Sequence, residues 1–192
     1  MVILKPRIEE HVAKPLNKVK VVFAGDIRNN MSYAWMYGCA KMGMHFVAYG
    51  PKELMEQVDK EVVKSAKEVA EYTGGTIEIS DSAEAVKGAD VIYTDVWASM
   101  GEEAQIPEKV KMLTPYKVTM DLLKATGNED VIFMHCLPAF HDFETKMARE
   151  QKELGFDIRE VTDEVFRSRH SVVFDEAENR MHTIKAVIVA TI

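Results

Sequence analysis

The stretch of the sequence richest in reactive side chains is 134–142, M-H-C-L-P-A-F-H-D, which holds two histidines, a cysteine and an aspartate. It follows an apolar run, and such a run ending at polar side chains and a proline is typical of a buried strand that delivers a loop to a ligand. His135 and Cys136 could act as a base and a thiol nucleophile. Neighbours in an extended chain point to opposite faces, however, and a cysteine nucleophile usually takes its histidine from elsewhere in the fold, so this use is disfavoured.

A second use of the same stretch is a zinc site formed by Cys136, His135, His141 and Asp142. It lacks the C-x-x-C or H-x-x-x-H framework of common zinc sites, so we expect neither a metal nor a cofactor. The better interpretation is that a partly buried thiol and free backbone groups line a small-molecule pocket. Pro138 then fixes the turn and is a candidate for a cis peptide bond.

The loop 25–30, G-D-I-R-N-N, follows the first apolar strand and is not a G-x-G-x-x-G fingerprint. The glycines that let a backbone approach a pyrophosphate are absent, which disfavours a dinucleotide site. Asn29 and Asn30 stand where a helix begins. They serve equally well as plain helix caps or as one cap plus one amide that donates to a ligand carboxylate at the positive helix end.

The loop 95–102 follows another buried strand and begins with Asp95. An aspartate at the end of a parallel strand is suited to holding a cationic amine, and the alternative is a cap for the helix that begins near Glu103. We expect Trp97 to pack in the core rather than to stack on a ligand.

Arg180 lies early in the last predicted helix, about 176 to 190. It is either a solvated i,i+4 partner for Glu176 or a guanidinium that reaches an anion at the same edge of the sheet. The helix also has an apolar face, which is either core or a surface for another domain; it includes Met181, Ile184, Val187 and Ile188.

Composition restricts the class of protein. The chain has 192 residues, 47% of them apolar, which suits one sizeable core, and a net charge of −7 that argues against binding nucleic acid. No apolar run approaches the ~20 residues that span a bilayer, and we see no signal peptide. Two cysteines far apart in an unexported chain favour free thiols, so we expect a cytoplasmic protein.

The elements that must position these side chains alternate between strands and helices. Strands are predicted at 19–24, 45–49, 76–79, 91–94 and 131–134, and the segment 116–119 is also strand-like. Helices are predicted between the strands at 31–44 and 52–73, with short ones at 83–87 and 108–113. This alternation predicts an α/β fold, a doubly wound three-layer sandwich with a mainly parallel five-stranded, Rossmann-like sheet. Right-handed crossovers place the strand C-terminal loops on one edge. Residues 1–17 are expected to be a lead-in segment, and 18–192 the α/β domain.

Five motifs in order resemble the ornithine carbamoyltransferase family, from about residue 8 to residue 192. They are G-D-x-R-N-N, D-V-W-x-S-M-G-E, H-C-L-P-A-F-H-D, E-V-T-D-E-V-F and F-D-E-A-E-N-R-M-H-T-I-K-A-V. The resemblance covers the ornithine-binding half of that family only. The S-x-R-T-R and H-P-x-Q segments, which belong to its carbamoyl-phosphate-binding half, do not occur in this sequence.

The resemblance implies a role for each matched position. The ornithine α-carboxylate would bind Asn30, and the α-amino end would bind Asp95 and Ser99, with Met100 on the same loop. Cys136 and the Leu137 backbone would line the reaction centre, and Arg180 would reach carbamoyl phosphate. In the family, the ornithine δ-amine attacks the carbamoyl carbon and yields citrulline and phosphate.

The same resemblance implies that a carbamoyl-phosphate domain is missing. We therefore expect the chain to fold and bind L-ornithine but to have little or no transferase activity, since carbamoyl phosphate would bind only with a complementary domain. Apolar faces of 8–16 and the last helix would then be exposed and favour weak self-association or a partner chain. The alternatives are an amino-acid-binding module without catalysis, one chain of a split enzyme and, least favoured, a dinucleotide-dependent oxidoreductase.

Overall fold

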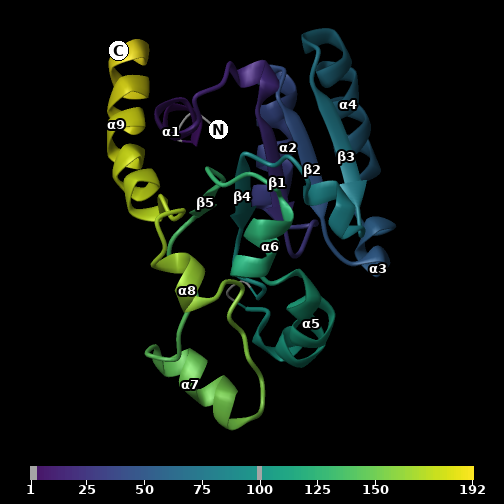
Figure 1. Ribbon diagram of the computed structural model, residues 1–192, viewed down its shortest axis with the longest axis vertical. Coiled ribbons are helices and arrows are strands. Elements are labelled where there is room, and N and C mark those ends of the chain that lie inside the picture. Colours follow the sequence, from purple (N-terminus) through teal and green to yellow (C-terminus); the bar gives the residue numbers. More distant parts are fainter. Residues whose placement is uncertain (1–3, 99–100) are drawn as a thin grey trace.

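A single parallel sheet forms the centre of the chain in a computed structural model that describes residues 4–98 and 101–192 (Figure 1). The sheet has five strands in the order β3-β2-β1-β4-β5, and all neighbouring pairs are parallel. This confirms the predicted fold class. The strands are β1 (Lys20–Ala24), β2 (His45–Tyr49), β3 (Thr76–Ser80), β4 (Val91–Thr94) and β5 (Ile132–His135).

Helices cover both faces of this sheet. Four short 3₁₀ turns accompany them in the described part of the chain, at Leu16–Lys18 (η1), Ala83–Val86 (η2), Glu103–Gln105 (η3) and Thr114–Tyr116 (η4). The described α-helices are α1 (Leu4–His11), α2 (Asn30–Met42), α3 (Lys52–Met55), α4 (Lys60–Thr73), α5 (Ile106–Leu113), α6 (Met120–Ala125), α7 (Lys146–Glu153), α8 (Asp163–Phe166) and α9 (Val173–Thr191).

Strand β1 shows how the sequence produces three layers. Val21 and Phe23 point into the core shared with α2 and α4, while Val22 and Ala24 point into the core shared with α6 and α8. Successive strand residues face opposite sides, so a strand that is covered on both sides reads as a continuous apolar run. The sheet is therefore the middle layer of the sandwich.

The region 52–73, predicted as one helix, is two helices, α3 and α4. The side chain of Asp59 accepts hydrogen bonds from the backbone N–H groups of Glu61 and Val62, so a new helix begins there. Leu54 and Val58 are both buried. These two residues are four apart, so the helical spacing of apolar residues continues across the break. For this reason the sequence pattern predicted a single helix.

Smaller differences occur where extended segments and helix ends were expected. The strand expected at 116–119 is reduced to one isolated bridge between Val118 and Val161. The region 83–87 forms the 3₁₀ turn η2 rather than an α-helix. Helix α9 begins at Val173, three residues before the predicted start.

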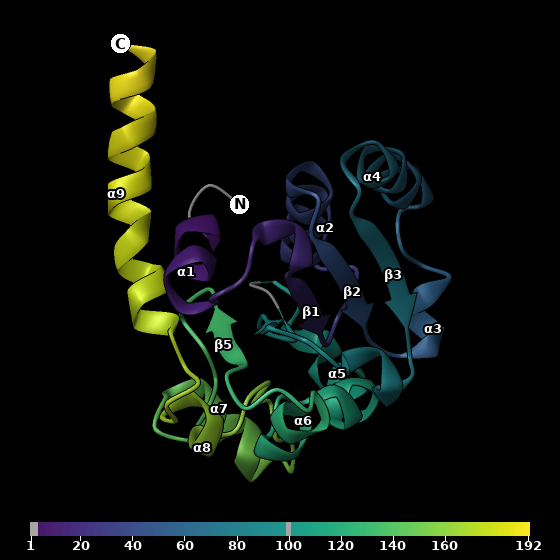
Figure 2. The same ribbon diagram turned by 45° about the horizontal axis from the view of Figure 1, so that its top comes forward.

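The N-terminal segment is part of the main core. Ile8 and Val12 are buried in the same cluster as β1 and α2, and α1 packs beside α9 (Figure 2). His11 Nε2 lies 3.4 Å from a carboxylate oxygen of Asp175 on α9. The expectation that an apolar face of 8–16 is exposed is therefore wrong, because its apolar side chains fill the core beneath α9.

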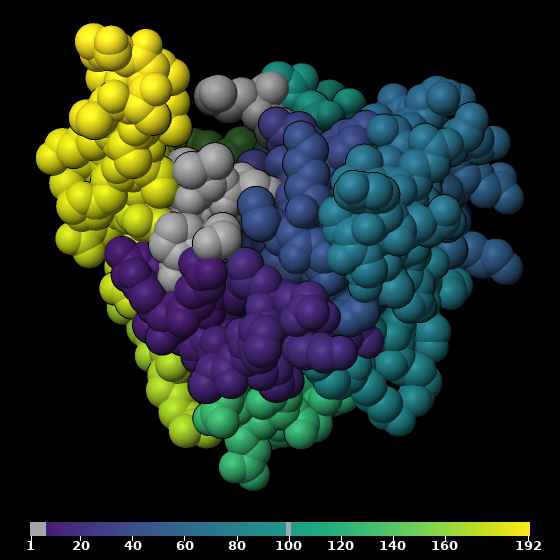
Figure 3. Space-filling view, turned by 90° about the horizontal axis from the view of Figure 1, so that it is seen from above, coloured from purple at the N-terminus to yellow at the C-terminus, as the bar shows by residue number. Residues whose placement is uncertain are grey.

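Helix α9 extends beyond the rest of the molecule, and Figures 2 and 3 show it as a ridge at one margin. None of the described helices is long and apolar enough to cross a membrane. Apolar side chains nevertheless remain exposed along α9, as the sequence predicted for one of its faces; they include Met181, Ile184, Val187, Ile188 and Val189.

Candidate functional site

Apart from Arg180, the predicted site residues follow strands whose C-terminal ends meet at one edge of the sheet. Strands β1 and β4 are neighbours, and from them the chain winds outward in opposite directions, to β2 and to β5. In open parallel sheets this reversal leaves a crevice outside the strand ends, where ligands bind. Residues 25–30, 95–98 and 136–140 come directly after β1, β4 and β5.

Asn29 and Asn30 follow β1, and only Asn29 caps the helix that begins there. The side chain of Asn29 accepts a hydrogen bond of 2.7 Å from the backbone N–H of Met31 and so caps α2. Asn30 is the first residue of the helix and is exposed. Its amide is therefore not needed as the cap, and it lies where the positive end of the helix dipole attracts an anion.

A charged network surrounds a hollow beside Asn30, and its central residues, Asp26 and Lys109, were not singled out from the sequence. The Asp26 carboxylate accepts hydrogen bonds from the Arg28 side chain at 2.9 and 3.0 Å, and Lys109 Nζ lies 3.6 Å away. Burial opposes ionisation of Asp26, but Arg28 and Lys109 hold its pKa below the ordinary value. Lys109 also donates to Glu102 at 2.8 Å. The hollow, about 390 Å³, is lined by Asp26, Arg28, Asn29, Asn30, Trp97, Glu102, Gln105 and Lys109.

After β4, Asp95 is half-buried and accepts a hydrogen bond of 2.8 Å from the backbone N–H of Val96. It does not cap the next turn, η3, which follows Glu102 and has no side-chain cap. Trp97 is 3% exposed and belongs to the core, as predicted. Asp95 is thus not a helix cap, and its carboxylate lies close to the Cys136 thiol.

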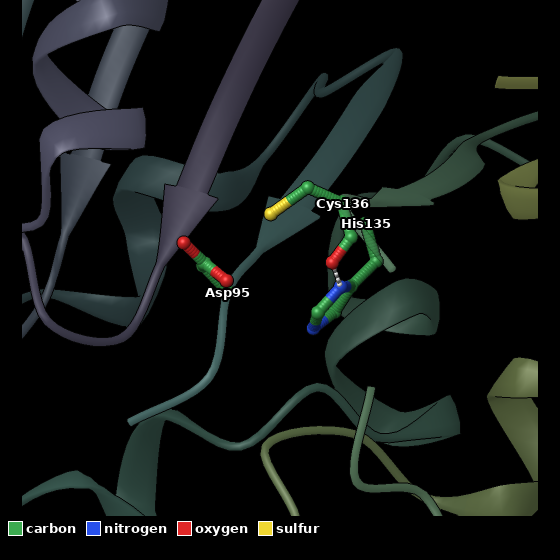
Figure 4. Close-up of side chains that lie close together, drawn as sticks. All are labelled: Asp95, His135 and Cys136. Atoms are coloured by element: carbon green, nitrogen blue, oxygen red, sulfur yellow. Dashed lines mark hydrogen bonds between the residues drawn. The ribbon is translucent and has the colours of Figure 1, made fainter. Parts of the chain in front are cut away.

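After β5, the chain brings His135 and Cys136 close to Asp95 (Figure 4). One ligand-type atom from each of the three side chains lies within 4.8 Å of the others. Alternation along a strand predicts that the side chains of His135 and Cys136 point to opposite faces. They lie closer together than that, because the His135 ring turns back and its Nδ1 lies 2.6 Å from the Cys136 carbonyl oxygen.

His135 is held on its other side by Glu160, which sequence reasoning did not single out. His135 Nε2 lies 3.0 Å from Glu160 Oε1, which also accepts a hydrogen bond of 2.6 Å from the backbone N–H of Phe140. Both ring nitrogens face oxygen acceptors, an arrangement that favours the doubly protonated imidazolium. Burial disfavours that charge, but the hydrogen bonds and the Glu160 carboxylate raise the pKa of His135. The ring is therefore a framework group rather than a base.

The four residues considered as a zinc site separate into two groups. His141 Nδ1 is 2.6 Å from Asp163 Oδ1, and its ring stacks on Phe166 with centroids 3.7 Å apart. Asp142 accompanies His141, while Cys136 lies with Asp95. These contacts fix the loop that follows the cis peptide bond between Leu137 and Pro138. The four side chains thus belong to two separate groups, one with Asp95 and the other with Asp163.

Leu137 and Arg180 are the other predicted residues that the structure describes. Leu137 is 37% exposed at the tip of the turn. Ser99 and Met100 lie outside the described residues. Arg180 is exposed on α9, one turn beyond Glu176. Glu176 is not the solvated partner of Arg180, because its carboxylate is buried and accepts hydrogen bonds from the Tyr93 hydroxyl and the His135 N–H.

Comparison with known proteins places the chain in a family. Residues 17–191 match the family model described as aspartate/ornithine carbamoyltransferase, Asp/Orn binding domain. A catabolic ornithine carbamoyltransferase of Clostridium perfringens is 63% identical over 187 residues, which are 96% of this chain and 56% of that protein. The structure of ornithine carbamoyltransferase from Pyrococcus furiosus has a TM-score of 0.78 and 40% identity, covering 97% of this chain and 54% of that one.

A third relative gives the same result at lower identity. The anabolic ornithine carbamoyltransferase of Campylobacter jejuni has a TM-score of 0.80 and 28% identity, covering 98% of this chain and 57% of that one. The chain thus spans about half the length of the relatives that it matches. The resemblance inferred from five motifs is confirmed, and the chain belongs to the aspartate/ornithine carbamoyltransferase family, within that family's aspartate/ornithine-binding domain.

Proposed function

We propose that this chain is the ornithine-binding half of an ornithine carbamoyltransferase. In that role residues 18–192 form the domain that binds L-ornithine, and residues 1–17 lead in from a carbamoyl-phosphate-binding half. The observation that carries the proposal is the position of Asn30, Asp95 and Cys136, each of which follows the C-terminal end of one of the adjacent strands β1, β4 and β5.

The chemistry of these groups matches the two ends of ornithine. The exposed Asn30 amide and the N-terminus of α2 are donors for the α-carboxylate. The Asp95 carboxylate is an acceptor for the α-ammonium group. The family resemblance adds Ser99 to the same task and assigns Met100 to the ornithine-binding residues. The δ-amine then points toward Cys136 and the Leu137 backbone.

The proposed reaction needs a second substrate. The neutral δ-amine attacks the carbamoyl carbon, and the bond from that carbon to the phosphate oxygen breaks. The amine gives up one proton to the departing phosphate, so the products are citrulline and phosphate. Cys136 and the Leu137 carbonyl line the site of attack, and Arg180 reaches toward the phosphate. The other groups that stabilise charge on phosphate come from the carbamoyl-phosphate-binding half of the relatives, so positioning and charge stabilisation are shared between two domains.

Calorimetric titration of the chain with L-ornithine tests the proposal. We expect saturable binding that Asp95→Asn weakens at least tenfold, because an amide does not provide the charge that pairs with the ammonium group. Asp121→Asn is the matched control, since that carboxylate is on the surface and its side chain is 93% exposed. Putrescine, which lacks the α-carboxylate, should bind weakly. Equal binding by both variants would contradict the assignment.

A citrulline assay separates the alternatives. The chain alone should form no citrulline from ornithine and carbamoyl phosphate, whereas addition of a family carbamoyl-phosphate domain should restore formation if the enzyme is split over two chains. The exposed apolar face of α9 favours such a partner. Ornithine binding without any restored activity would favour an amino-acid-binding module.

A further inference from the structure

Lys109, on α5, has a buried ammonium group in the wall of the hollow beside Asn30. Its side chain is 9% exposed, and its Nζ donates a hydrogen bond of 2.8 Å to Glu102 Oε2. A second carboxylate, that of Asp26, lies 3.6 Å from the same nitrogen. A buried charge without a partner is costly, so Lys109 needs an anion beside it whether or not a ligand is bound.

The two carboxylates beside Lys109 differ in how firmly they are held. Asp26 is buried, and its oxygens accept hydrogen bonds from the side chain and the backbone N–H of Arg28. The side chain of Glu102 is 36% exposed. An ion pair that reaches solvent contributes little to stability, because water solvates the freed carboxylate almost as well. Glu102 is therefore the partner of Lys109 that another anion can replace.

The hollow has the charges and the volume that a ligand carboxylate requires. Arg28 and Lys109 balance Asp26 and Glu102 around its wall, and Asn30 at the positive end of α2 lines it as well. If Glu102 turns out to solvent as a ligand carboxylate enters, the charge balance around the hollow is kept. We propose that Glu102 is an internal stand-in for the α-carboxylate of the bound amino acid, and that Lys109 exchanges one carboxylate for the other when the ligand binds.

The exchange gives Glu102 and Lys109 opposite effects on affinity. Glu102 competes with the ligand for the ammonium group, so its charge weakens binding, whereas Lys109 attracts the ligand carboxylate and strengthens binding. A purely structural ion pair behaves differently, because loss of either partner would then disturb the hollow and weaken binding. The exchange also selects an amino acid over a diamine, since a ligand without a carboxylate cannot replace Glu102. The choice of ornithine as the ligand rests on the proposed function.

Calorimetric titration with L-ornithine of the native chain, Glu102→Gln, Lys109→Met and the double variant tests the exchange. Glu102→Gln should bind ornithine about threefold more tightly, because a partly exposed ion pair no longer has to be broken. Lys109→Met should bind it at least about tenfold more weakly, because a charge-assisted contact with the carboxylate is lost. The double variant should bind as weakly as Lys109→Met, since without the ammonium group there is nothing for Glu102 to block.

Two control variants and two further ligands show that the carboxylate is what is exchanged. Glu108→Gln and Lys111→Met change exposed residues of the same helix and should leave ornithine affinity unchanged. L-ornithinamide, in which a neutral amide replaces the carboxylate, should bind equally to the native chain and to Glu102→Gln. Inorganic phosphate tests the other source of an anion: if Glu102→Gln tightens the binding of phosphate and not that of ornithine, the hollow is a phosphate site and the proposal is overturned.

The sign of the Glu102→Gln effect is decisive, even if Lys109→Met does not fold. Ornithine binding that is unchanged or weaker in Glu102→Gln would overturn the exchange and leave the proposed function standing. L-norvaline, which has the same carbon chain without the δ-amine, separates the opposite case. If it binds, and more tightly to Glu102→Gln, while ornithine does not bind, the exchange stands and the proposed function fails. No binding of either amino acid to any of the proteins would overturn both.

Discussion

At the scale of single residues, the loop after β5 is held by one carboxylate at both of its ends. Glu160 Oε1 contacts the His135 ring and the Phe140 N–H, so the four residues between them are confined. Glu160 and His135 are fully buried, and a buried charge pair is costly to break by removing one partner. This pair explains why Cys136 and Leu137 have a fixed position on a loop.

The pair predicts a pH dependence of stability. His135 has a folded-state pKa of about 10 against 6.5 for the unpaired group. Because the folded-state pKa is raised, the protonated His135 stabilises the folded state fully below pH 6.5. This stabilisation is lost as the pH rises through about 10. Glu160→Gln removes the charge, so its free energy of unfolding should be lower at pH 7 and should fall less steeply toward pH 10.

Urea unfolding from pH 6 to pH 10, followed by circular dichroism, checks this expectation. Glu164→Gln is the control, because Glu164 is exposed on the neighbouring helix α8. The other groups that titrate in this range are common to all three proteins. Parallel curves for the native chain and Glu160→Gln would contradict the assignment of the imidazolium.

At the scale of elements, the start of α2 separates a structural asparagine from a functional one. Asn29 caps the helix and Asn30 does not, so the two residues should respond differently to alanine. Asn29→Ala should cost about 1 kcal/mol of stability, the usual loss for a removed cap. Asn30→Ala should leave the melting temperature nearly unchanged and weaken ornithine binding.

Thermal melting measures the stability of both variants, and calorimetry measures their affinity for ornithine. Each variant is the control for the other. Loss of stability in Asn30→Ala with no change in ornithine affinity would assign that side chain to structure alone.

The elements could be predicted from sequence where one local pattern determines them. The five strands are runs of apolar, β-branched residues separated by helices, and their alternation was enough to derive the parallel sheet. The break at Asp59 was missed because apolar spacing continues across it. Glu160 and Glu176 were missed as framework groups because they lie 25 and 41 residues from His135, and only the fold brings them together.

At the scale of the whole molecule, α9 exposes apolar side chains along much of its length. Its exposed apolar residues include Val187 and Ile188, about half exposed, and Val189, 80% exposed. Exposed apolar surface on this scale marks a contact with another chain or domain. In the proposed enzyme that contact would be with the missing half, so the isolated chain should self-associate weakly.

Sedimentation velocity over a range of concentrations tests this expectation. The native chain should show a sedimentation coefficient that rises with concentration, and Val187→Lys with Ile188→Lys should remain monomeric at the same melting temperature. Lys185→Glu, an exposed change on the same helix, should not prevent association. A native chain that stays monomeric throughout would rule out this surface as a self-association site.

The attachment of α9 also has a mechanical consequence. The helix is rooted by Glu176 at the ends of β4 and β5, and its outer turns project from the body of the protein (Figure 2). A helix of 19 residues is about 28 Å long, so a tilt of about 5° at the root displaces the tip by about 2 Å. A shift of less than an ångström where Glu176 meets β4 and β5 would therefore become an ångström-scale displacement at the outer end of α9.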